Sequence, residues 1–178
     1  MPRGTDVIEH EVRITASPEI VFAHFTDPAR LVQWMGVDAT LDPRPGGVFR
    51  MVFQPTPEVA QFIAASSGAG GEQGTGDLDL STNAVLGAFV EVDPYERIVF
   101  TWGYEQELFS MPPQSSLVEV SLTAEGEETV VRLAHSRLPE AAAEFHRAGW
   151  DAYLPRLAIV ASGGDPGPDP LNVDKATD

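Results

Sequence analysis

Two histidines are the residues of this chain best suited to acid–base chemistry, because an imidazole titrates near neutral pH. His135 follows Val131 and Leu133 at the two-residue spacing of a strand, so it points to the same face as these apolar side chains. His146 lies one helical turn before Trp150. If the strand and the helix face each other, the two imidazoles share a cavity, and either one is a candidate general base. Alternatively, His135 makes a structural hydrogen bond at the end of its strand and His146 faces solvent.

Aromatic side chains fall on elements that we expect to face the same cavity. Their faces suit a hydrophobic or aromatic small molecule, and tryptophan and tyrosine each add a polar group that can orient it. The alternative for any one of them is that it only fills the core. The residues that we expect to line the cavity, together with His135 and His146, are Trp34, Phe49, Phe100, Trp102, Tyr104 and Trp150.

Metal and cofactor chemistry find little support in the sequence. The chain has no cysteine, which excludes disulfides, thiolate metal sites and cysteine nucleophiles. The sequence has no His-Glu-x-x-His pattern, and residues 77–83 begin like a calcium loop but have Thr82 and Ala88 where a glycine and a glutamate are needed. Dinucleotide-binding, phosphate-binding and serine-hydrolase motifs are also missing. We therefore expect neither a metal nor a cofactor.

The charge of the chain restricts its partners. Its 178 residues include 27 acidic and 11 basic side chains, which leaves a formal charge of -16. Such a balance argues against nucleic acid and against anionic membranes, since both are bound through clustered cations. No apolar run approaches the roughly 18 residues of a membrane span, and residues 1–15 lack the apolar region of a signal peptide. The sequence therefore predicts a soluble cytoplasmic protein of one domain.

The elements that would position these residues begin with a strand over residues 7–15, where apolar and polar side chains alternate. Ser17-Pro18 and Asp27-Pro28 each combine an N-cap with a proline at the first helical position, and so predict two short helices. We expect the second helix to carry Trp34 and to end at Gly36. Strands over 38–41 and 48–53 follow, joined by a turn of prolines and glycines.

The rest of the chain contains an insertion, four more strands and a long helix. Residues of about 54–84 lose the regular pattern and predict a long, partly mobile insertion with at most one helical turn. We expect the strands over 85–92, 97–104, 117–123 and 129–135, and the helix from Pro139 to about Ser162. Pro155 should kink or break that helix, and residues 163–178 predict a disordered tail. Segregated strands and helices indicate an α+β fold.

Several motifs in this order resemble the activator of Hsp-90 ATPase homologue family, which belongs to the START-like (SRPBCC), birch-pollen-allergen-like superfamily. The resemblance covers about residues 7–161 and implies a helix-grip fold, a curved antiparallel sheet wrapped around a long C-terminal helix with a cavity between them. The single domain would then span residues 7–162. The segments that carry the resemblance are 21–28 with Trp34, 42–50, 91–94, 97–102, and 149–157.

The resemblance leaves three functions open, because fold alone does not fix function. The leading interpretation is binding of a hydrophobic or aromatic small molecule in the cavity. The second is a protein-interaction or co-chaperone-like regulator of an ATPase, acting as a homodimer or with a protein partner. The third is an enzyme resembling polyketide cyclases and dehydratases, with His135 or His146 as its general base. The sequence favours binding over catalysis.

Overall fold

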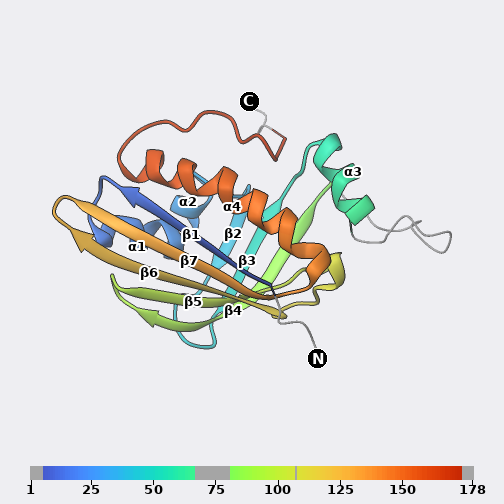
Figure 1. The fold of residues 1–178 in the computed structure, drawn as a ribbon, viewed down its shortest axis with the longest axis horizontal. Helices are drawn as coiled ribbons and strands as arrows, with labels where there is room; N and C mark the ends of the chain where they lie inside the picture. The colour runs from blue at the N-terminus through green and yellow to red at the C-terminus, as the bar shows by residue number, and fades with distance from the viewer. Residues whose placement is uncertain (1–5, 67–80, 107, 174–178) are drawn as a thin grey trace.

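A computed structural model describes residues 6–66, 81–106 and 108–173. Seven antiparallel strands form one sheet in the order β1-β7-β6-β5-β4-β3-β2, and the long helix α4 lies across its concave face (Figure 1). This is the helix-grip arrangement that the sequence predicts. The strands are β1 (Asp6–Ile14), β2 (Asp38–Leu41), β3 (Val48–Phe53), β4 (Asn83–Asp93), β5 (Arg97–Trp102), β6 (Ser116–Glu125) and β7 (Glu128–Leu138). The helices are α1 (Pro18–Thr26), α2 (Pro28–Leu31), α3 (Pro57–Ser66), η1 (Leu108–Ser110) and α4 (Glu140–Ala161).

The two short helices begin where their capping residues predict. The Ser17 hydroxyl accepts from the backbone N–H of Ile20, and the Asp27 carboxylate accepts from that of Ala29. The second helix is shorter than expected, because α2 ends at Leu31 and the chain continues in hydrogen-bonded turns. Trp34 therefore follows the helix instead of lying on it, and its indole N–H donates to a carbonyl oxygen of α1 at 3.0 Å.

The predicted strands are present, with one correction that concerns the site. β5 ends at Trp102, so Tyr104 lies beyond the strand and pairs with Val85 only through an isolated bridge. Gly103 separates the two aromatic residues because the chain passes another segment closely there. A Cβ atom at Gly103 would lie 1.9 Å from the carbonyl oxygen of Pro112, so only glycine fits without a rearrangement.

The insertion has more structure than the sequence predicts. In place of a single turn, α3 covers ten residues, and Ile63 on it is buried in the core. Figure 1 shows α3 at the end of the sheet, near the first turns of α4. The mobility that the sequence predicts for the remainder concerns residues 67–80, which lie outside the described part of the chain.

Pro155 does not break the C-terminal helix, which runs without interruption from Glu140 to Ala161. Proline has no N–H group, so the carbonyl oxygen of Asp151 lacks its usual intrahelical donor. Asp151 and Pro155 both lie on the exposed side of α4, where water can take the place of that donor. The helix therefore tolerates the proline at an exposed position.

Residues 163–173, which the sequence predicts to be disordered, form an ordered segment that we call the C-terminal strap. It runs back along α4 towards α3 (Figure 1). Asn172 is buried and accepts from the backbone N–H of Gln54 at 2.8 Å. The Arg156 guanidinium donates to three consecutive carbonyl oxygens of the strap, at residues 166–168. The segment is ordered by these distant partners, which its own glycine- and proline-rich composition does not reveal. Residues 174–178 lie outside the described part of the chain.

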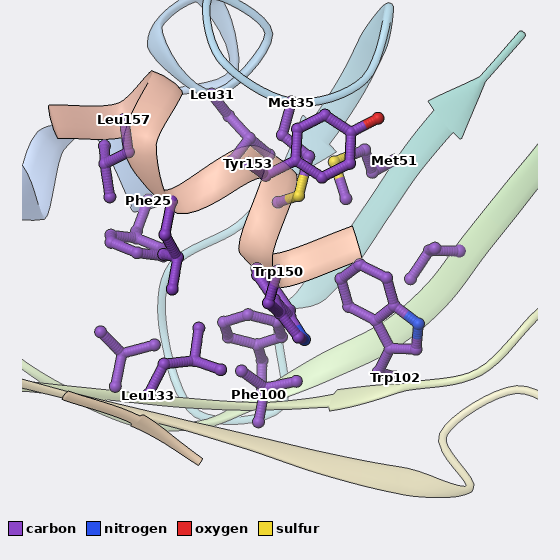
Figure 2. Packing of buried hydrophobic residues seen from close by; sticks show 14 of the residues in the cluster. Phe25, Leu31, Met35, Met51, Phe100, Trp102, Leu133, Trp150, Tyr153 and Leu157 are labelled. Atoms are coloured by element: carbon purple, nitrogen blue, oxygen red, sulfur yellow. The ribbon is translucent and has the colours of Figure 1, made fainter. Parts of the chain in front are cut away.

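The core fills most of the space between the sheet and α4. Figure 2 shows Phe100 and Leu133 of the sheet facing Trp150 and Leu157 of the helix, with Phe25 and Leu31 closing one end. The rings of Phe49 and Phe100 stack with centroids 4.1 Å apart. No helix in the described part of the chain is both long enough and apolar enough to cross a membrane.

Candidate functional site

The core leaves a pocket open at the end of the sheet that α3 covers, with a volume of about 60 Å³. We call it the end pocket. Its floor is formed by Trp102 and Tyr104, one side by Trp150 of α4, and another by Phe109 of η1. The lining is largely apolar. None of the described residues that line it is an aspartate, a glutamate, a lysine or an arginine, although the chain carries 27 acidic side chains.

The structure divides the predicted cavity residues into three groups. Four of them line the end pocket, namely Trp102, Tyr104, His146 and Trp150. His135, on β7, is fully buried and its ring contacts those of Trp102, His146 and Trp150. The remaining three, Trp34, Phe49 and Phe100, are at most 1% exposed within the core and are not among the described residues that line the end pocket. The structure places these three in the packed core, and their part in a ligand cavity stays a prediction.

His135 is held as a neutral imidazole by hydrogen bonds on both ring nitrogens. The Ser116 hydroxyl donates to the carbonyl oxygen of Trp102 at 2.6 Å, so it accepts from Nε2–H of His135 at 2.8 Å. The indole N–H of Trp150 donates to Nδ1 of His135 at 3.1 Å. A donor on one nitrogen and an acceptor on the other define one neutral tautomer.

His146 is fixed in the same way, with the opposite tautomer. Its Nδ1–H donates to the carbonyl oxygen of Ala142 at 2.7 Å, one turn earlier in α4. Its Nε2 therefore accepts from the hydroxyl of Tyr104, also at 2.7 Å. The rings of His135 and His146 lie with centroids 5.3 Å apart. We call His135, His146, Tyr104, Trp150 and Ser116 together the histidine network.

Burial keeps this network uncharged around neutral pH. Desolvation lowers the pKa of His146 to about 4. Desolvation also lowers the pKa of His135 well below its usual range, and the nearby His146 adds to this effect. The pKa of Tyr104 is raised, again because burial disfavours the charged form. The two histidines therefore share one buried site, as one of the sequence interpretations expects, but both are neutral and both of their acceptor nitrogens already receive a hydrogen bond.

One polar group of the end pocket has no partner. Trp102 is 4% exposed, and its indole Nε1–H makes no hydrogen bond to any described residue. In Figure 2 this nitrogen lies on the edge of the ring that faces away from Phe100 and Trp150. The Tyr104 hydroxyl lies near this N–H, and the interaction with Trp102 lowers the pKa of that hydroxyl against the larger effect of burial, but the two groups do not reach hydrogen-bonding geometry. The sequence predicts that Trp102 lines the cavity, but it contains no pattern that indicates an indole N–H without a hydrogen bond.

Two walls of the end pocket were missed by sequence reasoning, because they come from segments expected to be irregular. Val59 and Ile63 of α3 form one, and Leu171 and Asn172 of the C-terminal strap form the other. Asn172 holds its wall in place by donating to the Tyr153 hydroxyl at 2.8 Å and to the Asp169 carboxylate at 2.7 Å. Within the described residues there is no group of three or more histidine, aspartate or glutamate side chains placed to bind a metal ion.

The family model described as "Activator of Hsp90 ATPase homolog 1-like protein" matches residues 15–162 of the chain. The match ends where the C-terminal strap begins. No curated protein was found to match the chain.

One solved structure supports the same relationship, and two more distant ones share the fold. An AHSA1-like protein from Rhizobium etli is 33% identical, with a TM-score of 0.63, and the match covers 100% of this chain and 97% of that one. DynU16, from the dynemicin biosynthetic locus, is 21% identical with a TM-score of 0.65 over 92% of this chain, which spans only 50% of DynU16. The Aha1 dimer from Colwellia psychrerythraea is 18% identical with a TM-score of 0.62, and the match covers 89% of this chain and 98% of that one.

Proposed function

The chain belongs to the activator of Hsp90 ATPase homolog 1-like family, and from that premise we propose that it binds an uncharged hydrophobic or aromatic small molecule in the end pocket. The observation that carries this proposal is an unfilled, mostly apolar space inside an otherwise packed core, bordered by Trp102, Tyr104 and Trp150. Burial of apolar surface would drive binding, at about 25 cal/mol for each Å² removed from water.

The size of the end pocket limits what it holds without rearrangement. Its 60 Å³ exceeds the roughly 10–15 Å³ that one buried water needs, but it is far below the roughly 300–1,000 Å³ of pockets for drug-sized ligands. A ligand with one ring therefore requires a wall to move outwards. The wall formed by Val59 and Ile63 is the best suited to move, because α3 lies beyond the end of the sheet (Figure 1).

The chemistry of the histidine network favours binding over catalysis. A general base near neutral pH needs a free acceptor nitrogen and a pKa close to the working pH. His135 and His146 both lack the free nitrogen, and the pKa of His146 is lowered to about 4. A cyclase or dehydratase reaction that uses either histidine as its base is thus less well supported than ligand binding.

Gly149 provides the variant that tests this proposal. It lines the end pocket, and a Cβ atom built there meets no other heavy atom within 4 Å. Gly149→Leu should therefore place a side chain into the empty space and leave the backbone unchanged. Native mass spectrometry of the purified wild type should detect a co-purifying small molecule, and small aromatic ligands should raise its melting temperature.

The Gly149→Leu variant should lose both effects and keep the circular dichroism spectrum of the wild type. Gly149→Ala is the matched control, since it adds a single methyl group at the same helical position. We expect the control to bind ligands and to be more stable than the wild type by up to about 1 kcal/mol, because alanine favours a helix more than glycine does. A folded Gly149→Leu variant that binds the same ligands equally well would exclude the end pocket as the site.

A further inference from the structure

The free indole N–H of Trp102 is exceptional among the tryptophans of this chain. The sequence has three tryptophans, and all three lie within the described residues. The N–H of Trp34 donates to the carbonyl oxygen of His24, and that of Trp150 donates to Nδ1 of His135. Only the N–H of Trp102 has no acceptor in hydrogen-bonding geometry among the described residues, although the Tyr104 hydroxyl lies near it, and Trp102 lines the end pocket. A buried donor without an acceptor is costly, so a ligand that supplies an acceptor recovers this loss.

The neighbours of this N–H define the acceptor further. The described lining has no arginine or lysine to compensate a buried carboxylate, and His146 donates its only proton to its own helix. Burying an unpaired charge is far more costly than burying a neutral oxygen. The Tyr104 hydroxyl directs its proton to His146 and so leaves the ligand only an oxygen lone pair. Among the aromatic and histidine side chains of the described lining, Trp102 is therefore the one whose N–H has no partner in hydrogen-bonding geometry; the side-chain amide of Asn83 also lines the pocket.

We propose that the ligand of the end pocket is an uncharged, largely apolar molecule with a neutral oxygen acceptor, such as a ketone, and that Nε1–H of Trp102 donates a hydrogen bond to that oxygen. This inference rests on the proposed function and adds the chemical class of the ligand. It makes Trp102 the residue that determines specificity for the oxygen, while the apolar walls determine the fit of the remainder.

Two probes of nearly the same shape test the role of the oxygen. Acetophenone has a carbonyl where α-methylstyrene has a carbon–carbon double bond, and benzoate adds a negative charge to the same ring. Binding to the full chain is followed by two-dimensional ¹H–¹⁵N NMR of the three indole N–H groups, with signals assigned from tryptophan-to-phenylalanine variants. Acetophenone should bind about three- to tenfold more tightly than α-methylstyrene, the range expected for one neutral hydrogen bond. The Trp102 indole signal should shift with acetophenone and much less with α-methylstyrene.

Two variants separate the donor from the aromatic surface. Trp102→Phe removes the N–H group and keeps an aromatic ring, so the preference for acetophenone should disappear while some binding of both probes remains. Trp34→Phe is the matched control, because it removes an indole that is not among the described residues of the pocket lining and whose N–H is already used by the carbonyl oxygen of His24. In this control the preference should remain.

The outcomes distinguish this inference from the proposed function on which it rests. Equal binding of the two neutral probes, benzoate binding as tightly as acetophenone, or a preference that survives in Trp102→Phe would overturn the assignment and leave an apolar ligand site in place. If neither neutral probe binds to the wild type at millimolar concentration, the proposed function and this inference both fail.

Discussion

The indole N–H of Trp150 and Nδ1 of His135 are joined by a hydrogen bond of 3.1 Å, which connects α4 directly to β7, the strand next to the β1 edge of the sheet. Both side chains are buried, so neither group can exchange this partner for water. The bond also determines which nitrogen of His135 carries the proton, and through Ser116 it extends to the backbone of β5. Helix and sheet are thus held together by polar contacts inside an otherwise apolar interface.

Replacing Trp150 by phenylalanine should destabilise the fold. The change leaves Nδ1 of His135 buried without a donor, at a cost of roughly 1–3 kcal/mol, and removes part of a large apolar contact. Urea denaturation followed by circular dichroism measures the loss. Val173→Ala is a suitable control because Val173 is exposed, and it should change the free energy of unfolding by less than about 0.5 kcal/mol. Equal stability of Trp150→Phe and the wild type would show that the hydrogen bond contributes nothing.

Stability should fall as the solution becomes acidic, because His146 is neutral in the folded state. Its pKa falls from 6.5 to about 4 on burial, so between these values the unfolded chain binds a proton that the folded chain does not. This difference costs roughly 3 kcal/mol of stability by pH 4, added to the same effect from His135. His146→Gln should be less stable than the wild type at pH 8 and should show a shallower decline between pH 6.5 and 4. If the stability of both proteins declined in parallel, His146 would not be neutral in the folded state.

The C-terminal strap should lose its attachment when Asn172 is replaced by alanine. The change leaves the backbone N–H of Gln54 without its acceptor and removes the donor to Tyr153 and Asp169. We expect a loss of roughly 2–3 kcal/mol, since several buried polar groups are affected together. Hydrogen exchange should show faster exchange in the strap and in the last residues of β3. A variant whose strap exchanges as slowly as the wild type would mean that Arg156 and the backbone hydrogen bonds of Leu171 and Val173 are sufficient.

Replacing Pro155 by alanine should stabilise the protein. Alanine restores the N–H group that the carbonyl oxygen of Asp151 lacks, and Pro155 is exposed, so no buried contact is lost. Proline inside a helix costs about 3 kcal/mol relative to alanine, and we expect about 1–3 kcal/mol of this to be recovered. Thermal and urea denaturation both report the change. A decrease in stability would indicate that α4 depends on a bend at this position.

The features predictable from the sequence are those that depend on neighbouring residues. Ser17-Pro18 and Asp27-Pro28 start helices because a side chain and a fixed backbone angle act within one turn. The convergence of His135 and His146 followed from strand and helix periodicity, together with a family resemblance that places the helix over the sheet. These signals are carried by a few residues each, so a single sequence is sufficient to recognise them.

The remaining features depend on partners that are distant in the chain. The order of the strap depends on Asn172 and Arg156, which bond groups from other segments. The depth of Phe49 within the core depends on how closely Phe100 stacks against it. The free donor of Trp102 is the absence of a contact, and no pattern in a sequence reports that. Such features need coordinates because their cause is the arrangement of the whole fold.

The chain is strongly acidic, whereas the end pocket is lined by uncharged groups. The charge of the chain therefore acts on small molecules before they reach the pocket. Sixteen excess negative charges create a repulsive potential around the protein, which slows the encounter with anions and fades as salt is added. Neutral molecules do not experience this barrier. For the ligand class that we propose, discrimination against anions would therefore act twice, first in the rate of collision and then in the uncharged pocket, and only the first would depend on ionic strength.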